Sequence, residues 1–328
     1  MTAPIRIAVT GGAGQIAYSL LFRIGNGEVF GPQQPVVLQI LEIPPAMEAL
    51  RGVVMELQDS AQPLLQDIII SDDPNIAFKD ANWAILVGGM PRGPGMARSD
   101  LIAANGPIFV AQGKALSACA ADDIRVLVVA NPCNSNCLVA KANAPDIPPD
   151  RFFAMTRLDE NRARSQLAQK AGVQVSDVSK IAIWGNHSST QFPNFEHALI
   201  KGEPAESIIG DRVWLEKAFM STVQDRGAAI ISARGKSSAA SAANAALDSI
   251  RSLIHPTPAG EWFSAGIPSD GNPYGIADGL VYSFPLRSDS DGNVEIIEGL
   301  ELSEYALGKI RATEAELKAE REAISDLL

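Results

Sequence analysis

The chain has 328 residues, of which 46% are hydrophobic and 20% charged, and its formal net charge is −11. This length is typical of two domains with a sizeable buried core. The acidic balance argues against nucleic acid or an anionic membrane as the main partner.

The N-terminal segment and the cysteines indicate the compartment. The chain enters an apolar strand pattern by about residue 5, which leaves no room for a signal peptide. No apolar run reaches the roughly 18 residues that a membrane helix needs. Cys119, Cys133 and Cys137 are an odd number without metal-ligand spacing, so we expect reduced thiols, no metal and a cytoplasmic protein.

Short apolar runs alternate with helical patterns in the first half of the chain. We expect strands at 5–11, 36–42, 67–70, 83–89 and 125–131, and helices at 14–25, 46–58, 99–120 and 134–143. The strands are apolar throughout, as is typical of parallel strands that are covered on both faces. The pattern therefore predicts an α/β fold in which the N-terminal domain, residues 1–155, is a doubly wound parallel sheet of the Rossmann type.

A proline-rich stretch at 143–153 marks the boundary, and residues 156–328 form the second, α+β domain. We expect helices at 157–172, 211–232, 237–254 and from about 302, strands at 180–185, 262–266 and 280–286, and a hairpin-like region near 190–203. In the last helix Ile310, Leu317 and Ile324 recur at seven-residue spacing, which predicts a stripe that faces the core.

A glycine-rich turn follows the first expected strand. Gly12, Gly14 and Ala17 form the pattern G-x-G-x-x-A directly before a helix. Glycine allows a close approach of the backbone to a pyrophosphate, and the helix N-terminus supplies N–H donors. The pattern alone is weak, but in this strand–turn–helix context it indicates a dinucleotide site.

Glu42 ends the second expected strand. A carboxylate at this place can accept the ribose hydroxyls of the adenosine and repels a 2′-phosphate, which favours NAD over NADP. The alternative is that Glu42 only solvates the end of a strand.

His187 is the best candidate for proton transfer, because it follows an apolar strand and histidine is the natural acid and base near neutral pH. Asp159 could fix its tautomer, and Arg162 lies three residues further along the same helix. By position alone His187 could be an ordinary hydrogen-bonding residue, and Asp159 and Arg162 a local helix pair.

Several long motifs in order decide between these interpretations. "TGGAGQIAYSL", "ILVGGMPRGPGMARSDL", "VVANPCNSNC", "TRLDENRAR" and "WGNHSSTQFP" resemble the lactate/malate dehydrogenase family, and within it the cytosolic-type malate dehydrogenase branch. The resemblance runs from about residue 5 to the C-terminal helix. One departure is Glu160, where the family motif has histidine, and another is Cys133 beside Asn131.

The resemblance implies a role for each matching residue. His187 would exchange the proton and Asp159 would orient it; Arg162 would bind the carboxylate beside the reacting carbon. Arg98 would polarise the carbonyl oxygen, Arg92 on a closing loop would bind the distal carboxylate, and Asn131 would contact both substrate and nicotinamide. The NAD site would comprise Gly11, Gly12, Ala13, Gly14, Gln15, Ile16, Ala17, Glu42, Gly88, Asn105, Gln112, Val129 and Asn131. The resemblance also implies a homodimer and a place in the tricarboxylic acid cycle.

Two arginines suit a dicarboxylate, because each guanidinium can bind one carboxylate through its planar fork. With a monocarboxylate such as pyruvate, Arg92 would be desolvated without a partner, so its presence favours malate. A lactate or broader 2-hydroxyacid dehydrogenase is the first alternative. A catalytically silent NAD-binding sensor is the second, and it would be expected to lack part of this polar set.

Overall fold

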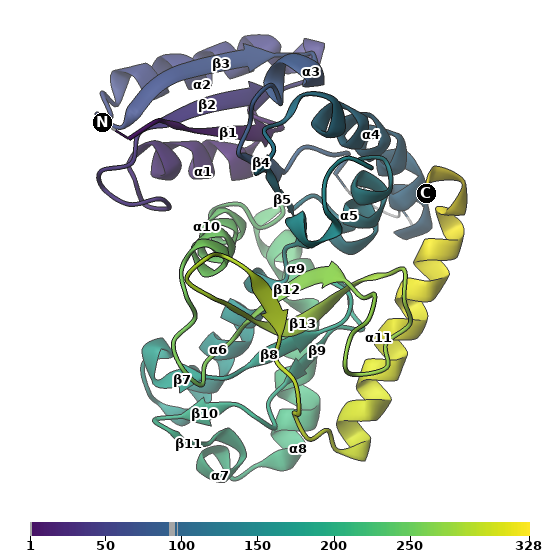
Figure 1. The fold of residues 1–328 in the computed structure, drawn as a ribbon. Helices are drawn as coiled ribbons and strands as arrows, with labels where there is room; N and C mark the ends of the chain where they lie inside the picture. Colours follow the sequence, from purple (N-terminus) through teal and green to yellow (C-terminus); the bar gives the residue numbers. More distant parts are fainter. Residues whose placement is uncertain (1, 92–95, 97) are drawn as a thin grey trace. The chain divides into compact units, whose positions relative to one another are not determined.

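The structure is a computed structural model that describes residues 2–91, 96 and 98–328 (Figure 1). Arg92, assigned above to the distal carboxylate, lies outside the described residues. The chain divides into two compact units. Unit 1 comprises Met1–Ala154, Ala239–Arg251 and Glu320–Leu328; unit 2 comprises Met155–Ser238 and Ser252–Ala319.

Strands and helices alternate through the first 154 residues of unit 1. The elements are β1 (Ile5–Thr10), α1 (Gln15–Gly25), β2 (Val36–Leu41), α2 (Met47–Asp59), β3 (Leu65–Ser71), α3 (Pro74–Ala77), β4 (Trp83–Leu86), α4 (Arg98–Cys119), β5 (Arg125–Val128), α5 (Cys133–Ala142) and β6 (Phe152–Ala154).

The sheet of unit 1 has the strand order β6-β5-β4-β1-β2-β3, and neighbouring strands are parallel. Helices α1 and α2 pack against β2 and β3 (Figure 1). This is the doubly wound order of a dinucleotide-binding fold, in which the chain reverses direction across the sheet between β1 and β4. The parallel α/β fold predicted for the N-terminal half is therefore confirmed.

Unit 2 is built around antiparallel pairs of strands. Its first helix, α6 (Arg157–Ala171), packs on β8 (Ala182–Trp184), β9 (Phe192–Asn194) and β12 (Phe263–Pro268). The remaining elements that belong to it wholly or in part are β7 (Val178–Ser179), β10 (Leu199–Ile200), β11 (Glu203–Pro204), α7 (Ala205–Ile209), α8 (Arg212–Trp214), α9 (Met220–Arg234), α10 (Ala240–Ile254), β13 (Val281–Ser288), β14 (Val294–Ile296) and α11 (Glu304–Ala323).

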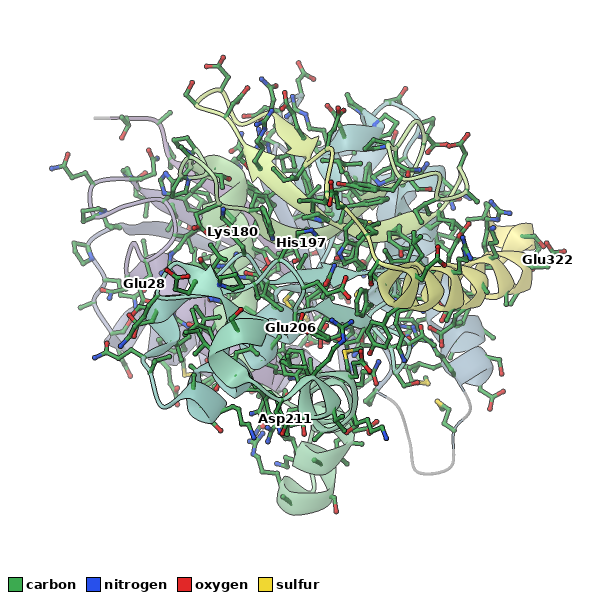
Figure 2. The ribbon with its side chains drawn as sticks, turned by 90° about the horizontal axis from the view of Figure 1, so that it is seen from below. Glu28, Lys180, His197, Glu206, Asp211 and Glu322 are labelled. Carbon is green, nitrogen blue, oxygen red and sulfur yellow. The ribbon has the colours of Figure 1, made fainter. Side chains whose placement is uncertain are left out.

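Aromatic side chains fill the interior of unit 2. The Trp184 ring packs edge-on to Phe284 at 6.1 Å between centroids, and Tyr282 lies 4.8 Å from Phe284. Charged residues such as Asp211 and Glu322 are exposed and point outward (Figure 2). Among the described residues, no helix combines the length and apolar composition needed to cross a membrane.

Most of the expected elements are present, but several boundaries differ. β4 ends at Leu86 rather than at residue 89, and β5 ends at Val128 rather than at 131, because the chain there turns into loops. The helix expected over 211–232 is α8, a π-helical segment at Leu215–Phe219 and α9 in succession. The three-residue strand β6 was missed because its two phenylalanines lie inside the stretch 143–153 that was interpreted as the domain boundary. Ile310 and Leu317 in α11, and Ile324 directly after its end, are all buried, as predicted.

Candidate active site

The turn after β1 brings the backbones of two loops into contact. Gly11 has a φ of +70°, and a Cβ there would lie 2.7 Å from Cα of Gly88, which follows β4. The Gly88 N–H donates to Oγ1 of Thr10 at 2.8 Å. Both positions therefore require glycine, and they join the carboxyl ends of β1 and β4, where ligands bind in folds of this topology.

The N-terminus of α1 follows directly. Gly14 is its N-cap residue and makes no side-chain capping bond, and the first turn holds no acidic residue. The orphan N–H groups of a helix start attract an anion, and no carboxylate in the first turn of α1 opposes one there. The predicted residues Gln15, Ile16 and Ala17 form this turn, so the geometry suits a pyrophosphate.

Glu42 follows β2 and reaches the same turn. Its Oε2 accepts a hydrogen bond from the Ala13 N–H at 3.0 Å, and its Oε1 accepts from the Ile43 N–H at 2.8 Å. These bonds hold the carboxylate beside the glycine turn. The position fits the role of a ribose acceptor, since a carboxylate oxygen can accept further hydrogen bonds.

The side chain of Asn105 binds backbone groups of the protein. It is fully buried in α4; its Oδ1 accepts from the Met90 N–H at 2.7 Å, and its Nδ2 donates to the carbonyl of Asn131 at 2.9 Å. It therefore connects the chain after β4 to the chain after β5. A contact between Asn105 and NAD stays a prediction.

Gln112 and Val129 complete the predicted NAD set. Both are buried, and Oε1 of Gln112 has no hydrogen-bond partner among the described residues. An orphaned buried acceptor is the kind of atom that a ligand or an ordered water satisfies. Together with the glycine turn and Glu42, it makes the residues of unit 1 compatible with a bound dinucleotide.

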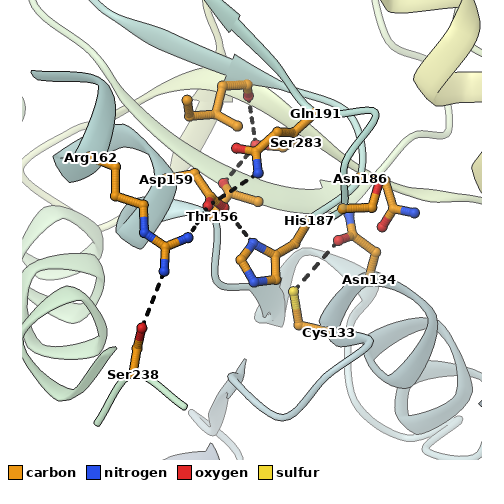
Figure 3. Close-up of polar contacts among 12 residues, drawn as sticks. Cys133, Asn134, Thr156, Asp159, Arg162, Asn186, His187, Gln191, Ser238 and Ser283 are labelled. Carbon is orange, nitrogen blue, oxygen red and sulfur yellow. Dashed lines mark hydrogen bonds and ion pairs between the residues drawn. The ribbon is translucent and has the colours of Figure 1, made fainter. Parts of the chain in front are cut away.

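Asp159 is the centre of a polar cluster in unit 2 (Figure 3). It is fully buried at the start of α6 and accepts hydrogen bonds from His187 Nδ1, from Arg162 Nη1 at 3.0 Å and from Gln191 Nε2 at 3.3 Å. The structure thus brings together the three unit 2 residues that the sequence predicted, and it adds Gln191.

The electrostatic balance keeps Asp159 ionised. Burial by itself raises the pKa of its carboxyl, but the charge and hydrogen bond of His187, the charge of Arg162 and the hydrogen bond of Gln191 outweigh it. The pKa therefore lies below the ordinary value for aspartate. A carboxylate can only accept, so Nδ1 of His187 carries the proton of this hydrogen bond.

Arg162 is held from two sides. Nη1 donates to Asp159, and Nη2 donates to Oγ of Ser238 at 3.3 Å (Figure 3). Its side chain is 12% exposed. Among the described residues these bonds use two of the five N–H donors of the guanidinium, which leaves donors for a carboxylate.

The loop that carries His187 is fixed by α11. Glu316 Oε2 accepts from Asn186 Nδ2 at 2.8 Å, from Thr190 Oγ1 at 2.6 Å and from Ser188 Oγ. Thr313, one turn earlier on α11, accepts from the Asn186 N–H at 2.9 Å. Sequence reasoning missed this network, because a glutamate on a polar helix looks like a solvated residue.

Arg98, the predicted carbonyl-polarising residue, begins α4 in unit 1. Its Nε donates to Oε1 of Glu320 at 2.5 Å. Sequence analysis did not single out Glu320, although a signal exists: it lies three residues after Leu317 and four before Ile324, on the apolar stripe of the last helix. Among the described residues, no cluster of three or more His, Cys, Asp or Glu suits a metal.

Comparison with known proteins identifies the family of the chain. The model of the lactate/malate dehydrogenase NAD binding domain matches residues 5–154, and that of the alpha/beta C-terminal domain matches residues 156–327. A malate dehydrogenase of Protochlamydia amoebophila is 56% identical over 328 residues, which cover 100% of this chain and 99% of the relative.

Two solved structures are similar over nearly the whole chain. Malate dehydrogenase from Naegleria fowleri has a TM-score of 0.96 and 49% identity, with 100% of both chains covered. Trichomonas vaginalis lactate dehydrogenase in complex with NADH and oxamate has a TM-score of 0.95 and 37% identity, with 98% of both chains covered. The chain belongs to the lactate/malate dehydrogenase family, and its N-terminal part is an NAD-binding domain.

Proposed function

We propose that this protein is an NAD-dependent malate dehydrogenase, which oxidises (S)-malate reversibly to oxaloacetate. The observation that carries the proposal is the buried carboxylate of Asp159, which binds His187 and Arg162 at the same time. A 2-hydroxy acid carries its hydroxyl on the carbon next to a carboxylate. A base and a guanidinium joined by one aspartate are therefore spaced to bind both groups of such a substrate. The name of the 56% identical relative, malate dehydrogenase, supports the same substrate.

Arg162 binds and orients the substrate in this mechanism. Asp159 and Ser238 hold the plane of its guanidinium, so its remaining donors can form a bidentate pair with the carboxylate beside the reacting carbon. Because the guanidinium is already fixed, little entropy is lost when the substrate binds.

His187 moves the proton. During oxidation its Nε2 accepts the proton of the malate hydroxyl, and Asp159 stabilises the imidazolium that results. In the reverse direction the imidazolium donates that proton to the carbonyl oxygen of oxaloacetate. Arg98 stabilises the negative charge on this oxygen, which is a form of electrostatic catalysis, and Asn131 contributes a further polar contact.

The cofactor site lies in unit 1. Gly11 to Ala17, Glu42, Gly88, Gln112 and Val129 would hold NAD, with the pyrophosphate at the start of α1 and the ribose at Glu42. When bound, NAD supplies the acceptor for the hydride that leaves malate. Glu42 would set the preference over NADP, because a 2′-phosphate would meet its carboxylate.

Parallel assays with two substrates and two cofactors test the proposal. Oxidation of NADH is followed with oxaloacetate and with pyruvate, and the assay is repeated with NADPH. We expect fast turnover of oxaloacetate with NADH and little with pyruvate or NADPH. A preference for pyruvate would replace malate by lactate as the substrate, and inactivity with both acids would favour an NAD-binding sensor.

The Arg92→Leu variant tests the assignment of the distal carboxylate. We expect the ratio of kcat/KM for oxaloacetate to that for pyruvate to fall by about 10²-fold or more, because the leucine variant neither pairs the second carboxylate nor buries an unpaired charge. An unchanged ratio would show that Arg92 does not select the substrate.

Assembly and location complete the proposal. The resemblance to the cytosolic-type branch supports a cytoplasmic homodimer that works in the tricarboxylic acid cycle. Light scattering of the purified protein measures the mass of the assembly, and a mass of one chain would exclude the dimer. Fractionation of the source cells tests the compartment.

A further inference from the structure

A glutamate interrupts the apolar stripe of α11. The stripe comprises Ile310, Thr313, Leu317 and Glu320 and continues in Ile324 directly after the helix, and all five residues are buried. A charged side chain is rarely buried unless it is paired. Glu320 therefore needs partners inside the fold, and the stripe itself supplies none that is charged.

The partners come from two other helices of unit 1. Oε1 of Glu320 accepts from Arg98 Nε at 2.5 Å, and Oε2 accepts from Ser135 Oγ on α5. The Glu320 side chain is 7% exposed, whereas that of Arg98 is 27% exposed. The carboxylate is thus nearly enclosed, and the guanidinium is partly open.

This difference in burial decides between two roles for the pair. If Glu320 were a latch that releases Arg98 to the substrate, each release would leave a buried carboxylate without its cation, which is strongly unfavourable. If Glu320 is a fixed anchor, the pair stays intact while the exposed part of Arg98 meets the substrate. The burial favours the anchor.

We propose that Glu320 is a positioning residue that orients Arg98 before the substrate binds. The inference rests on the proposed role of Arg98 as the group that polarises the reacting oxygen. A donor that is already aimed at the developing charge needs no reorganisation during the reaction. The C-terminal helix thereby contributes to turnover through a residue that contacts neither substrate nor cofactor.

Four variants, including the Arg98→Ala/Glu320→Ala double variant, and one control test the proposal in the full-length enzyme. Glu320→Ala removes the anchor, and Glu320→Gln keeps an acceptor for Arg98 and a polar group for Ser135 but removes the charge. In the Arg98→Ala background Glu320 has no guanidinium to position, so its removal should not affect catalysis further. Glu322→Gln, on the same helix but exposed (Figure 2), removes one negative charge elsewhere and serves as the control.

We expect Glu320→Ala to lower kcat for oxaloacetate reduction by about 10²-fold, the scale of a misplaced catalytic group. Glu320→Gln should lie between it and the wild type, and Glu322→Gln should match the wild type. The Kd of NADH, measured by fluorescence, should be unchanged in all of them. In the Arg98→Ala background, Glu320→Ala should lower kcat by no more than about twofold, because the two residues act as one unit.

If Glu320→Ala lowers kcat by about 10²-fold even in the Arg98→Ala background, the proposal is overturned, and a Glu320→Ala enzyme with wild-type kcat also overturns it. Thermal unfolding of the wild type, Glu320→Ala, Arg98→Ala and the double variant measures the ion pair independently of activity. Non-additive shifts in Tm would confirm that Glu320 binds Arg98, and additive shifts would overturn the anchor even in an active enzyme. An inactive wild type with non-additive Tm shifts would instead refute the proposed function and leave the ion pair standing.

Discussion

Two neighbouring carboxylates at the start of α6 have different surroundings. Asp159 is bound by His187, Arg162 and Gln191, whereas Glu160 accepts from the Ser264 N–H at 2.7 Å and pairs with Arg157 at 3.4 Å. Both are buried. Asp159 contacts the imidazole of His187, whereas Glu160 contacts a guanidinium and a backbone N–H, so the proposed proton transfer is assigned to the pair that contains Asp159.

Replacement of His187 tests the proton-transfer step. The change His187→Asn should lower kcat for oxaloacetate reduction by about 10²–10⁴-fold, because asparagine cannot exchange a proton. The Kd of NADH should stay near the wild-type value. His255→Asn, which changes an exposed histidine, is the matched control, and a His187→Asn enzyme as active as this control would remove His187 from the mechanism.

Asp159 also predicts a dependence of stability on pH. Its pKa is lower in the folded protein than in the unfolded chain, so its contribution to stability is complete above the ordinary aspartate pKa of about 3.9. As the pH falls below this value the unfolded chain takes up a proton first, and the contribution declines until it is lost below the folded pKa.

The Asp159→Asn variant lacks this titration. At neutral pH we expect it to be less stable than the wild type by about 3–5 kcal/mol, since Arg162 loses its buried partner. The difference should shrink as the pH falls through the aspartate range. Urea unfolding of both proteins from pH 7 downward measures it, and a difference that stays constant or grows would contradict the assignment.

The residue types in the site were predictable from local pattern, whereas the pairing of His187 with Asp159 was predicted only through the family resemblance. Helical spacing alone made Asp159 and Arg162 a local pair, and Asp159 and Glu160 are equivalent by pattern. The family motif indicated which carboxylate meets the histidine. The importance of Glu320 could have been predicted from the helical period, because a charged residue on an apolar stripe needs a partner inside the fold.

At the scale of elements, α11 combines an apolar stripe with a polar edge that contacts the loop of His187. Glu316 and Thr313 bind the side chains or backbone of Asn186, Ser188 and Thr190, the residues on both sides of His187. A loop with so many contacts to a rigid helix can keep its histidine in one orientation.

Removal of the Glu316 carboxylate should release this loop. For Glu316→Ala we expect kcat to fall by roughly 10-fold to 10²-fold, because His187 then samples unproductive positions. The Kd of NADH should not change, since the NAD-binding residues belong to unit 1. Glu322→Ala on the same helix controls for the lost charge, and equal kcat values in the two variants would show that the loop does not need Glu316.

The positions of the helices and strands could be predicted from local periodicity, whereas the residues at which they end could not. β4 and β5 stop at Leu86 and Val128, although the apolar runs continue for one or two residues. Their ends depend on bonds such as that of Asn105 to Met90 and Asn131. These bonds join segments that are distant in sequence, so no window of local pattern contains them.

At the scale of the whole molecule, neither unit is a single continuous stretch of the chain. Ala239–Arg251 and Glu320–Leu328 belong to unit 1 with the first 154 residues. In unit 1, Arg23 donates to Asn244 at 3.0 Å, and Asn143 donates to the carbonyl of Leu327 at 2.8 Å. The C-terminal segment is thus part of the folded NAD-binding unit.

Truncation tests this arrangement. A chain that ends at Ala319 loses Ile324, which is fully buried, along with Glu320 and the contacts of Leu327. We expect the free energy of unfolding to fall by at least about 2 kcal/mol, with weaker binding of NADH. A chain that ends at Leu327 should behave like the full protein, because Leu328 is exposed. Equal Tm values for the two truncations would exclude a structural role for the C-terminal segment.

The sequence by itself determined the alternation of strands and helices, the glycine turn and the chemical types in the site, because these are written in residues that are close along the chain. Only the tertiary structure decided that Arg98 pairs with Glu320 and that the C-terminal segment belongs to unit 1. His187 and Asp159 are 28 positions apart, and Arg98 and Glu320 are 222 positions apart. A buried charge selects its partner through the geometry of packing, which joins residues regardless of their separation in sequence.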